Sequence, residues 1–188
     1  MVKRAFDLTA ALILSVLLAV PAAILMLLIR LDSPGPAIFR QERLGKNGKP
    51  FMILKLRSMR LDAEKNGPRW AERNDSRCTR LGSFLRRSRL DELPQLWNIL
   101  HGEMSFVGPR PERAYFYDQF EKTIPGFRNR LAVIPGLTGL AQVNGGYDLS
   151  PDQKIVFDMK YIENCCVGMD LSCMLKTVRL VFTHEGAR

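Results

Sequence analysis

The 188-residue sequence lacks the common fingerprints of nucleotide-dependent and metal-dependent enzymes. It contains no GxxxxGK[ST] phosphate loop, no GxGxxG turn, no HExxH zinc motif and no GxSxG nucleophile motif. The DxD motif of ordinary nucleotide-sugar glycosyltransferases is also absent. These absences argue against a P-loop triphosphatase, a dinucleotide-dependent dehydrogenase, a zincin protease and an α/β-hydrolase.

Cysteine and histidine are scarce as well. The four cysteines form no CxxC pair, and the two histidines stand apart at His101 and His184. Structural zinc sites and disulfide frameworks need such residues in pairs at short, regular spacing. We therefore expect reduced thiols, as in a cytosolic compartment, and no structural zinc.

Acidic residues are too few in the first half of the chain to balance the basic ones. Residues 1–100 contain 18 Lys or Arg against 9 Asp or Glu, whereas residues 101–188 contain 10 of each. The net charge of +9 therefore arises in the first half. Nucleic acid, anionic lipid and a phosphorylated small molecule all suit such a surface, and composition does not choose among them.

No charged residue occurs from Leu8 through Ile29. A helix of this length extends about 33 Å at 1.5 Å per residue, enough to cross a hydrocarbon core of about 30 Å. The run is longer than the apolar part of a signal peptide, and no cleavage site follows it. Residues 1–32 are therefore predicted to form a membrane-anchoring helix, broken near Pro21, which lacks an amide hydrogen.

Basic residues flank this apolar run on both sides, with Lys3 and Arg4 before it and Arg30 after it. Positive charge normally marks the cytoplasmic side of a membrane segment, and a simple spanning helix cannot satisfy both ends. A helix that turns at Pro21 and leaves by the same face would satisfy both. Charge alone leaves the spanning and the re-entrant topologies open.

The remainder, residues 33–188, is predicted to form one cytoplasmic α+β domain, predominantly helical, with a small β-sheet and amphipathic helices. Residues 37–40 and 51–58 have the composition of short strands. In the second strand the period of two places Lys55 and Arg57 on the same face, an arrangement that a solvated strand face would also explain.

An acidic pair lies in the run LDELPQLWNIL, residues 90–100, whose leucines recur at helical spacing. Pro94 suits the first turn of this helix, so Asp91 and Glu92 fall at or just before its N-terminus. Two acids there can simply compensate the helix dipole. The basic residues just upstream, Arg86 among them, favour a site instead.

Two further segments carry candidate binding residues. In GPRP, residues 108–111, each proline holds the preceding residue in an extended conformation, which presents Arg110 from a stiff backbone suited to phosphate binding. Residues 135–146 are predicted to be turns around a short strand, with Gln142 and Asn144 projecting from the same side.

Apolar residues at helical spacing also predict an amphipathic C-terminal helix that contains Leu171, Met174, Leu175 and Val178. We expect its apolar stripe to close the core rather than to dock at a membrane surface.

The run RLDELPQLWNILHGEMSFVGPRPE, followed by PGLTGLAQVNG, resembles the bacterial sugar transferase family, the monotopic phosphoglycosyl transferases. The resemblance extends over nearly the whole chain. It implies a re-entrant membrane segment over residues 1–32, a catalytic domain over residues 33–188 on the cytoplasmic face of the bacterial inner membrane, and Mg²⁺ as cofactor. The implied reaction transfers a sugar 1-phosphate from a UDP-sugar to undecaprenyl phosphate, releases UMP and initiates membrane-linked glycan synthesis.

The resemblance also assigns roles to residues. Asp91 resembles the nucleophile that forms a covalent aspartyl-phosphosugar intermediate, and Glu92 resembles the Mg²⁺ ligand, with Asp91 as a second candidate ligand. The residues predicted to bind phosphate are Lys55, Arg57, Arg86 and Arg110, and the other site candidates are Asp158, Gln142 and Asn144. The chain departs from the family pattern at Val20, Arg89, Ile134 and Gly146.

Two alternatives stay open. A membrane-tethered nucleic-acid-binding or regulatory module would explain the basic first half, although the resemblance predicts no nucleic acid as a partner. A single-displacement transferase would use Asp91 or Glu92 only to bind metal or to act as a base. The partners predicted for the covalent enzyme are a UDP-sugar, undecaprenyl phosphate and membrane lipid, and a homo-oligomer is compatible with it.

Overall fold

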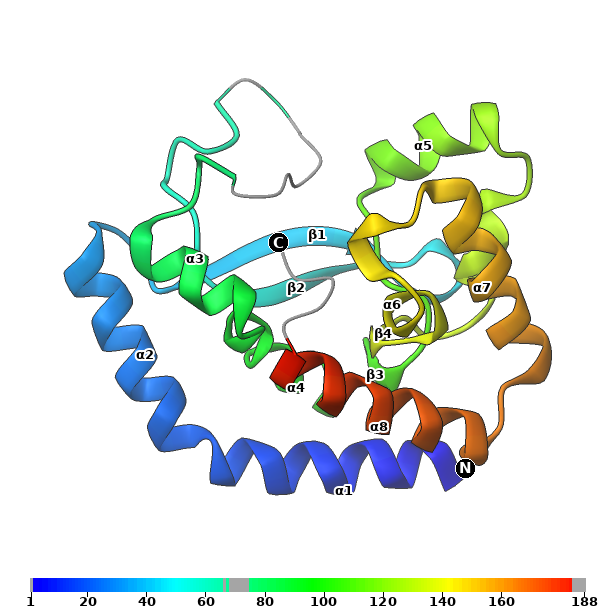
Figure 1. Ribbon diagram of the computed structural model, residues 1–188, viewed down its shortest axis with the longest axis horizontal. Coiled ribbons are helices and arrows are strands. Elements are labelled where there is room, and N and C mark those ends of the chain that lie inside the picture. The colour runs from blue at the N-terminus through cyan, green and yellow to red at the C-terminus, as the bar shows by residue number, and fades with distance from the viewer. Residues whose placement is uncertain (1, 66, 68–74, 184–188) are drawn as a thin grey trace.

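The computed structural model describes residues 2–65, 67 and 75–183, and in these the fold is mostly helical with two small sheets (Figure 1). The predicted α+β, predominantly helical class is confirmed. The helices are α1 (Val2–Leu17), α2 (Ala19–Asp32), α3 (Arg80–Arg87), α4 (Gln95–Leu100), α5 (Ala114–Thr123), α6 (Leu140–Val143), α7 (Pro151–Asn164) and α8 (Val167–Thr183). The strands are β1 (Ile38–Leu44), β2 (Pro50–Leu56), β3 (Ser105–Val107) and β4 (Gly136–Thr138).

Helices α1 and α2 form a bent pair, with an angle of 60° between them. In the described part of the chain no single helix is long and apolar enough to cross a membrane, and this pair meets the length and composition criteria only together. The break lies at Leu18 rather than at Pro21. Proline clashes with the carbonyl four residues earlier, here that of Leu17, so the helix opens one turn before the proline.

The first turns of α1 are fixed to the rest of the protein by three charged residues. Lys3 Nζ lies 2.7 Å from Asp170 Oδ2 on α8. Arg4 donates to the carbonyl oxygens of the last two residues of α4, at 2.6 and 2.9 Å. Asp7 is buried and accepts a hydrogen bond from the backbone amide of Phe106 in β3. The N-terminal end of the bent pair is therefore anchored on the domain that follows it.

The C-terminal end of α2 is held by Arg57, which is 5% exposed. Its guanidinium donates to the carbonyl oxygens of Ile29, Ser33 and Pro34 at 3.3, 2.6 and 2.7 Å. Strand β2 ends at Leu56, so the period of two does not extend to Arg57. The prediction that Arg57 binds phosphate beside Lys55 is corrected accordingly, because its Nη1 and Nη2 atoms are bound to the end of α2 and the linker that follows it.

The two sheets have opposite pairing. Strands β1 and β2 form an antiparallel hairpin, in which Ile38 pairs with Leu56 and Leu44 with Pro50. Strands β3 and β4 are parallel and very short. The largest apolar cluster brings together residues of α1, β2, α4, β3, α7 and α8, at the base of the molecule in Figure 1.

Close backbone contact joins the loop after β3 to the segment around β4. A Cβ atom on Gly136 would lie 2.1 Å from the amide nitrogen of Gly108, and one on Gly139 would lie 2.1 Å from the carbonyl oxygen of Gly108. Only glycine permits such an approach. The amide of Gly108 donates to Thr138 at 2.9 Å, so the two segments are locked together.

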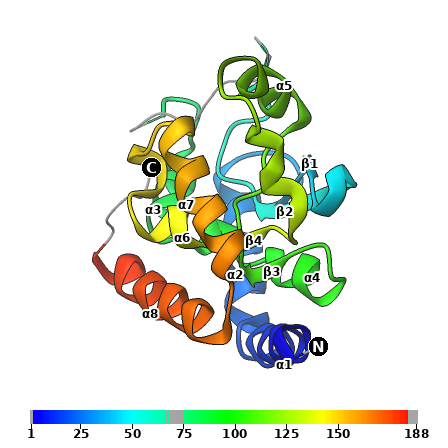
Figure 2. The ribbon, with the colours of Figure 1, turned by 90° about the vertical axis from the view of Figure 1, so that its right-hand side faces the viewer.

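Helix α8 lies beside α1 along the base of the molecule (Figures 1 and 2). The prediction that its apolar stripe closes the core is wrong for Leu171, Leu175 and Val178, which are exposed, Leu175 at 72%. The opposite face packs inward instead, with Cys173 buried in the largest apolar cluster and Asp170 bound to Lys3.

We expect Arg57→Met to lower the free energy of unfolding by about 2–4 kcal/mol, because it removes the charged donor from three carbonyl oxygens at and after the end of α2, of which that of Ile29 is buried. Chemical denaturation of the detergent-solubilised protein measures this. Arg40→Met, at an exposed position on β1, is the control and should change stability by less than about 0.5 kcal/mol. Equal stability of the two variants would show that the contacts of Arg57 contribute little.

Candidate active site

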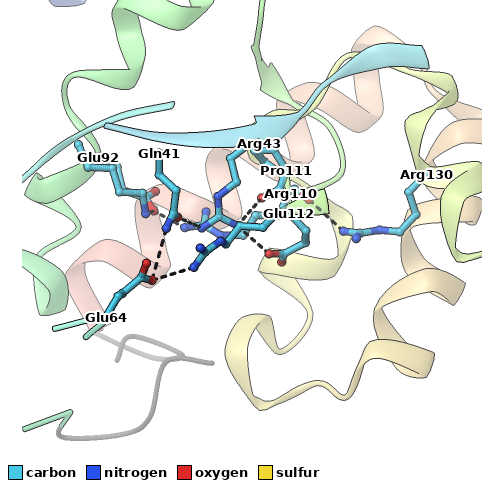
Figure 3. Close-up of polar contacts among 10 residues, drawn as sticks. Gln41, Arg43, Glu64, Glu92, Arg110, Pro111, Glu112 and Arg130 are labelled. Atoms are coloured by element: carbon cyan, nitrogen blue, oxygen red, sulfur yellow. Dashed lines mark hydrogen bonds and ion pairs between the residues drawn. The ribbon is translucent and has the colours of Figure 1, made fainter. Parts of the chain in front are cut away.

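The acidic pair lies where four segments of the chain meet. Asp91 and Glu92 belong to a short 3-10 turn, Leu90–Glu92, between α3 and α4. Lys55 reaches Glu92 from β2. Arg110 reaches Glu92 from the loop after β3 (Figure 3). The sequence prediction that the pair precedes a helix is confirmed, since α4 begins at Gln95 directly after Pro94.

The backbone before the pair adopts an uncommon conformation. Arg89 has φ +57° and ψ +14°, in the left-handed region that residues other than Gly, Asn and Asp rarely adopt. This residue lets the chain leave α3 and turn sharply into the 3-10 segment. The acidic pair is therefore presented by a tight turn rather than by the regular first turn of α4.

Glu92 is the electrostatic centre of the arrangement. Its Oε1 atom accepts from Lys55 Nζ at 3.2 Å and also from Arg110 Nη2. Burial alone would raise the pKa of Glu92, but the charges of Arg110 and Lys55 outweigh that effect and hold its pKa below the usual range. Glu92 is therefore ionised at neutral pH.

Asp91 is in a different state, although it is the adjacent residue. It is 7% exposed, and in the described part of the chain no hydrogen bond to its carboxylate is formed. Burial is the largest influence and raises the pKa of Asp91 to about 6, assisted by the charge of Glu92 and opposed by Lys55, Arg86 and Arg110. At pH 7 and above, most molecules carry an ionised Asp91 that faces cations without being hydrogen-bonded.

Arg86 and Lys55 match their predicted positions around the pair. Arg86 occupies the last turn of α3 and acts on Asp91 through its charge. Its guanidinium also contacts the Cys78 sulfur at 3.2 Å. Of the four predicted phosphate-binding residues, the structure thus brings three to the pair, and Arg57 lies at the end of α2 instead.

Arg110 is positioned by a buried ion pair. Arg130 Nη2 donates to the carbonyl oxygen of Arg110 at 3.1 Å (Figure 3). Arg130 Nε lies 2.6 Å from Asp158 Oδ2. The side chains of Arg130 and Asp158 are both 1% exposed. Asp158 therefore acts on the site through Arg130 rather than by touching the acidic pair.

Sequence reasoning missed Arg130, and it also missed the pair formed by Arg43 and Glu112. Arg43 Nη1 on β1 lies 2.9 Å from Glu112 Oε2, next to Arg110 (Figure 3). The signal for Arg130 is Asp158, because an acid that is buried needs a partner of opposite charge. Nothing in the sequence indicated which of the many arginines that partner would be.

The prediction for Gln142 and Asn144 is wrong in its geometry. Both follow β4, and Gln142 lies in the short helix α6 rather than on a strand. The Asn144 side chain is exposed and donates to the carbonyl oxygen of Leu140 at 2.7 Å. Gln142 is buried beside a cavity, so the two side chains do not project from one side.

This cavity, with a volume of about 440 Å³ including its open mouth, adjoins Arg110. Basic residues from several segments line it, namely Arg89, Arg110, Arg130 and Lys154. The cavity and the acidic pair therefore share Arg110, which contacts Glu92 on one side and lines the cavity on the other.

The acidic pair supplies two carboxylates, which are only part of a coordination shell for Mg²⁺. Within the described residues, no cluster of three or more His, Cys, Asp or Glu could hold a metal ion. Mg²⁺ commonly uses one or two carboxylates and completes its shell with water and substrate phosphate. Adjacent carboxylates at Asp91 and Glu92, with Asp91 free of hydrogen bonds in the described residues, are compatible with that mode.

Comparison with known proteins gives the family. The family model described as bacterial sugar transferase matches residues 1–184. The chain belongs to the bacterial sugar transferase family. The match includes the acidic pair, the GPRP loop and the bent helix pair, which all lie within residues 1–184.

Named relatives are similar over nearly the whole chain. A UDP-N-acetylgalactosamine-undecaprenyl-phosphate N-acetylgalactosaminephosphotransferase of Aeromonas hydrophila is 43% identical over 190 residues, which are 100% of this chain and 45% of that protein. UDP-glucose:undecaprenyl-phosphate glucose-1-phosphate transferases of Caulobacter vibrioides and Escherichia coli are 43% and 38% identical. These alignments cover 98% and 100% of this chain and 71% and 41% of the relatives. The chain therefore spans less than half the length of two of these proteins.

We expect Asp91→Asn to stabilise the metal-free protein by about 1–3 kcal/mol at pH 7.5, because each unit of pKa shift corresponds to about 1.4 kcal/mol. The folded state retains the Asp91 proton up to about pH 6, whereas the unfolded chain loses it near 3.8. Ionisation therefore costs the wild type stability as the pH rises from about 4 through about 6.

Thermal unfolding in the presence of a chelator, from pH 4 to pH 8, measures the difference. The gain should shrink towards zero as the pH falls below about 4. Asp62→Asn, at an exposed position, is the control and should show no comparable gain. A less stable Asp91→Asn protein at pH 7.5 would contradict the assignment of Asp91 as a buried, uncompensated carboxylate.

Proposed function

We propose that this protein transfers a sugar 1-phosphate from a UDP-sugar to undecaprenyl phosphate through a covalent intermediate on Asp91. The observation that carries this proposal is the contrast within the acidic pair. Glu92 is bound by Lys55 and Arg110, whereas the adjacent Asp91 faces the same cations without a hydrogen bond in the described residues. Relatives named as undecaprenyl-phosphate sugar phosphotransferases support the same reaction.

In the first half-reaction, an Asp91 carboxylate oxygen attacks the β-phosphorus of the UDP-sugar. A bond forms between that oxygen and phosphorus, the bond from phosphorus to the bridging oxygen breaks, and UMP leaves with the electron pair. Lys55, Arg86 and Arg110 lower the repulsion between the carboxylate and the diphosphate, since their charges all act on Asp91. Covalent catalysis of this kind divides one difficult transfer into two easier ones.

In the second half-reaction, a phosphate oxygen of the polyprenyl phosphate attacks the phosphorus of the aspartyl adduct. The bond to Asp91 breaks, the carboxylate is regenerated, and the lipid diphosphate sugar departs. Glu92, joined by Asp91 when its carboxylate is free, would hold Mg²⁺, which would supply neutralisation of part of the diphosphate charge. Arg110 is ready for the same purpose without rearrangement, because Arg130 and Asp158 already hold its backbone.

The acceptor is a lipid, so the site must lie close to a bilayer. We infer that α1 enters the inner membrane from the cytoplasmic side and that α2 leads the chain back out on that same side. Lys3, Arg4 and Asp7 at one end of the pair, and the carbonyl groups bound by Arg57 at the other end, all contact the same domain. A spanning helix would place its two ends about 30 Å apart on opposite sides of the bilayer.

Exposed apolar side chains support this arrangement. They occur on the bent pair and on α8, and the most exposed of them are Val2, Val16, Leu17, Val20, Leu31 and Leu175. Soluble monomers rarely expose apolar patches of this extent. The α8 stripe would then rest in the interface between lipid headgroups and acyl chains, beside the helix pair.

The alternative of a nucleic-acid-binding module is less well supported. Nucleic-acid binding calls for a basic stripe on the surface that follows the phosphate backbone. Here Lys55, Arg86 and Arg110 converge on two carboxylates, and Arg57 and Arg130 are buried in structural contacts. The single-displacement alternative uses the same residues. Trapping of a labelled adduct in the absence of lipid acceptor distinguishes it from the covalent route.

The covalent route predicts a trapped adduct. Detergent-solubilised protein is incubated with Mg²⁺ and a UDP-sugar labelled at the β-phosphorus, without lipid acceptor, and the labelled peptide is identified by mass spectrometry. We expect label on Asp91, released UMP in equal amount, and loss of the label when polyprenyl phosphate is added. Asp91→Asn should lower both half-reactions at least a thousandfold, because it removes the nucleophile.

Asp62→Asn serves as the control and should keep wild-type activity. Robust turnover of the wild type with no protein-bound label under any quench would favour single displacement. Near-normal activity of Asp91→Asn would exclude Asp91 as the nucleophile.

The re-entrant topology predicts that both ends of the helix pair lie on one side of the membrane. Single cysteines are placed at Val2→Cys and Leu31→Cys, both highly exposed, in a background that lacks the four native cysteines. Neither should react with a membrane-impermeant maleimide in intact cells, and both should react after permeabilisation. Lys46→Cys, exposed between β1 and β2, is the control for the cytoplasmic side. Labelling of Val2→Cys alone in intact cells would establish a spanning helix.

A further inference from the structure

The two proposed half-reactions use the acidic pair and its cations, and they assign no ligand to the cavity beside Arg110. Arg89, Arg110, Arg130 and Lys154 are the basic residues of its wall, and Glu112 is the acidic one. Arg110 is paired with Glu92 and Arg130 with Asp158, so the excess positive charge of the wall comes from Arg89 and Lys154. The charge of Glu112 is compensated by Arg43 at 2.9 Å. The electrostatic potential of the cavity therefore favours an anion, and the shared residue Arg110 brings that anion next to the acidic pair.

The same wall contains buried polar atoms without partners. Arg130 Nη1 and both amide atoms of Gln142, Oε1 and Nε2, form no hydrogen bond within the described residues. Arg130 is 3% exposed and Gln142 is 8% exposed. Native proteins rarely bury such groups unpaired, because each loses its bonds to water and gains nothing in return. Orphaned donors and an orphaned acceptor on two residues that line one cavity favour a ligand that supplies the complementary groups.

We propose that this cavity holds the nucleoside monophosphate half of the donor substrate, with its phosphate against Arg110 and Arg130 and its nucleoside against Gln142. The inference rests on the proposed function, since that reaction must release a nucleoside monophosphate beside the acidic pair. The phosphate that leaves needs cations next to the phosphorus under attack. Arg110 meets this requirement because it contacts Glu92 and lines the cavity.

The chemistry of Gln142 fits the other half of the ligand. A glutamine amide presents one acceptor and two donor hydrogens in a plane. The edge of a uracil ring presents an N–H donor beside a carbonyl acceptor, so the two edges can form a pair of hydrogen bonds. The backbone around Gln142 is held in place, since α6 directly follows the glycine contact that fixes β4 to the GPRP loop.

Gln142→Met tests the proposal, because methionine has nearly the same length and volume but cannot form the amide hydrogen bonds. In the free protein these bonds are not made, so the variant should unfold at the same temperature as the wild type or above it. Isothermal titration of the full-length, detergent-solubilised protein with UMP should show affinity weakened about tenfold or more. Affinity for inorganic phosphate should be unchanged.

Gln95→Met is the matched control. Gln95 is fully buried, and both of its amide atoms are also without partners in the described residues, but it does not line the cavity. Its substitution should leave UMP affinity unchanged. An equal loss of UMP affinity in both variants, or no loss in Gln142→Met, overturns the proposal. It is also overturned if the wild type binds UMP no more tightly than inorganic phosphate.

A second pair of variants keeps the test decisive if Gln142→Met does not fold. Lys154 lines the cavity and Lys160 is exposed farther along the same helix, α7, outside the cavity lining. Lys154→Ala should weaken UMP binding severalfold and Lys160→Ala should not, although both remove one positive charge. Equal UMP affinity in these two variants overturns the assignment of the cavity.

Turnover of a UDP-sugar with polyprenyl phosphate separates this inference from the proposed function. If the wild type turns over and Gln142→Met binds UMP normally, the subsite is wrong and the function stands. If the wild type binds UMP through Gln142 but turns over no UDP-sugar, the function is wrong and the subsite stands.

Discussion

The structure depends on the compensation of two adjacent carboxylates in one buried turn. Burial alone would protonate both Asp91 and Glu92, since removal from water disfavours each negative charge. Lys55 and Arg110 satisfy Glu92 by direct contact and act on Asp91 only through space. The result is one firmly ionised, immobilised acid beside one reactive acid. A single cation, or one placed elsewhere, would not separate the two neighbours in this way.

This compensation requires that cations from distant parts of the chain be held in place before any substrate arrives. Arg110 is fixed through a relay that runs from Asp158 to Arg130 and then to its own backbone. The glycine contact between Gly108 and Gly136 fixes the same loop from the other side. The two most characteristic sequence motifs, GPRP and PGLTG, are therefore two halves of one support, and Arg110 of that support also lines the cavity beside the acidic pair.

The helix pair is integrated with this site rather than attached to it by a flexible tether. Arg4 binds the end of α4, which follows the acidic pair, and Asp7 binds β3, which leads to Arg110. Arg57 joins the end of β2, which carries Lys55, to the end of α2. Each end of the pair thus contacts an element that positions the acidic pair or one of its cations. Under the proposed function, a lipid acceptor that reached the site along these helices would meet side chains already held in place, so little free energy would be lost in ordering them.

The sequence by itself determined the elements whose cause is local. The uncharged run of 22 residues, the proline-bounded turn that carries Asp91 and Glu92, and the stiff backbone of Arg110 all follow from neighbouring residues. Tertiary structure alone decided the rest, namely that Arg57 binds the end of α2 and that Arg130 is the partner of Asp158. The physical reason is that an arginine side chain is long and binds any acceptor within reach. Its partner is therefore set by the folding of distant segments, which no local pattern records.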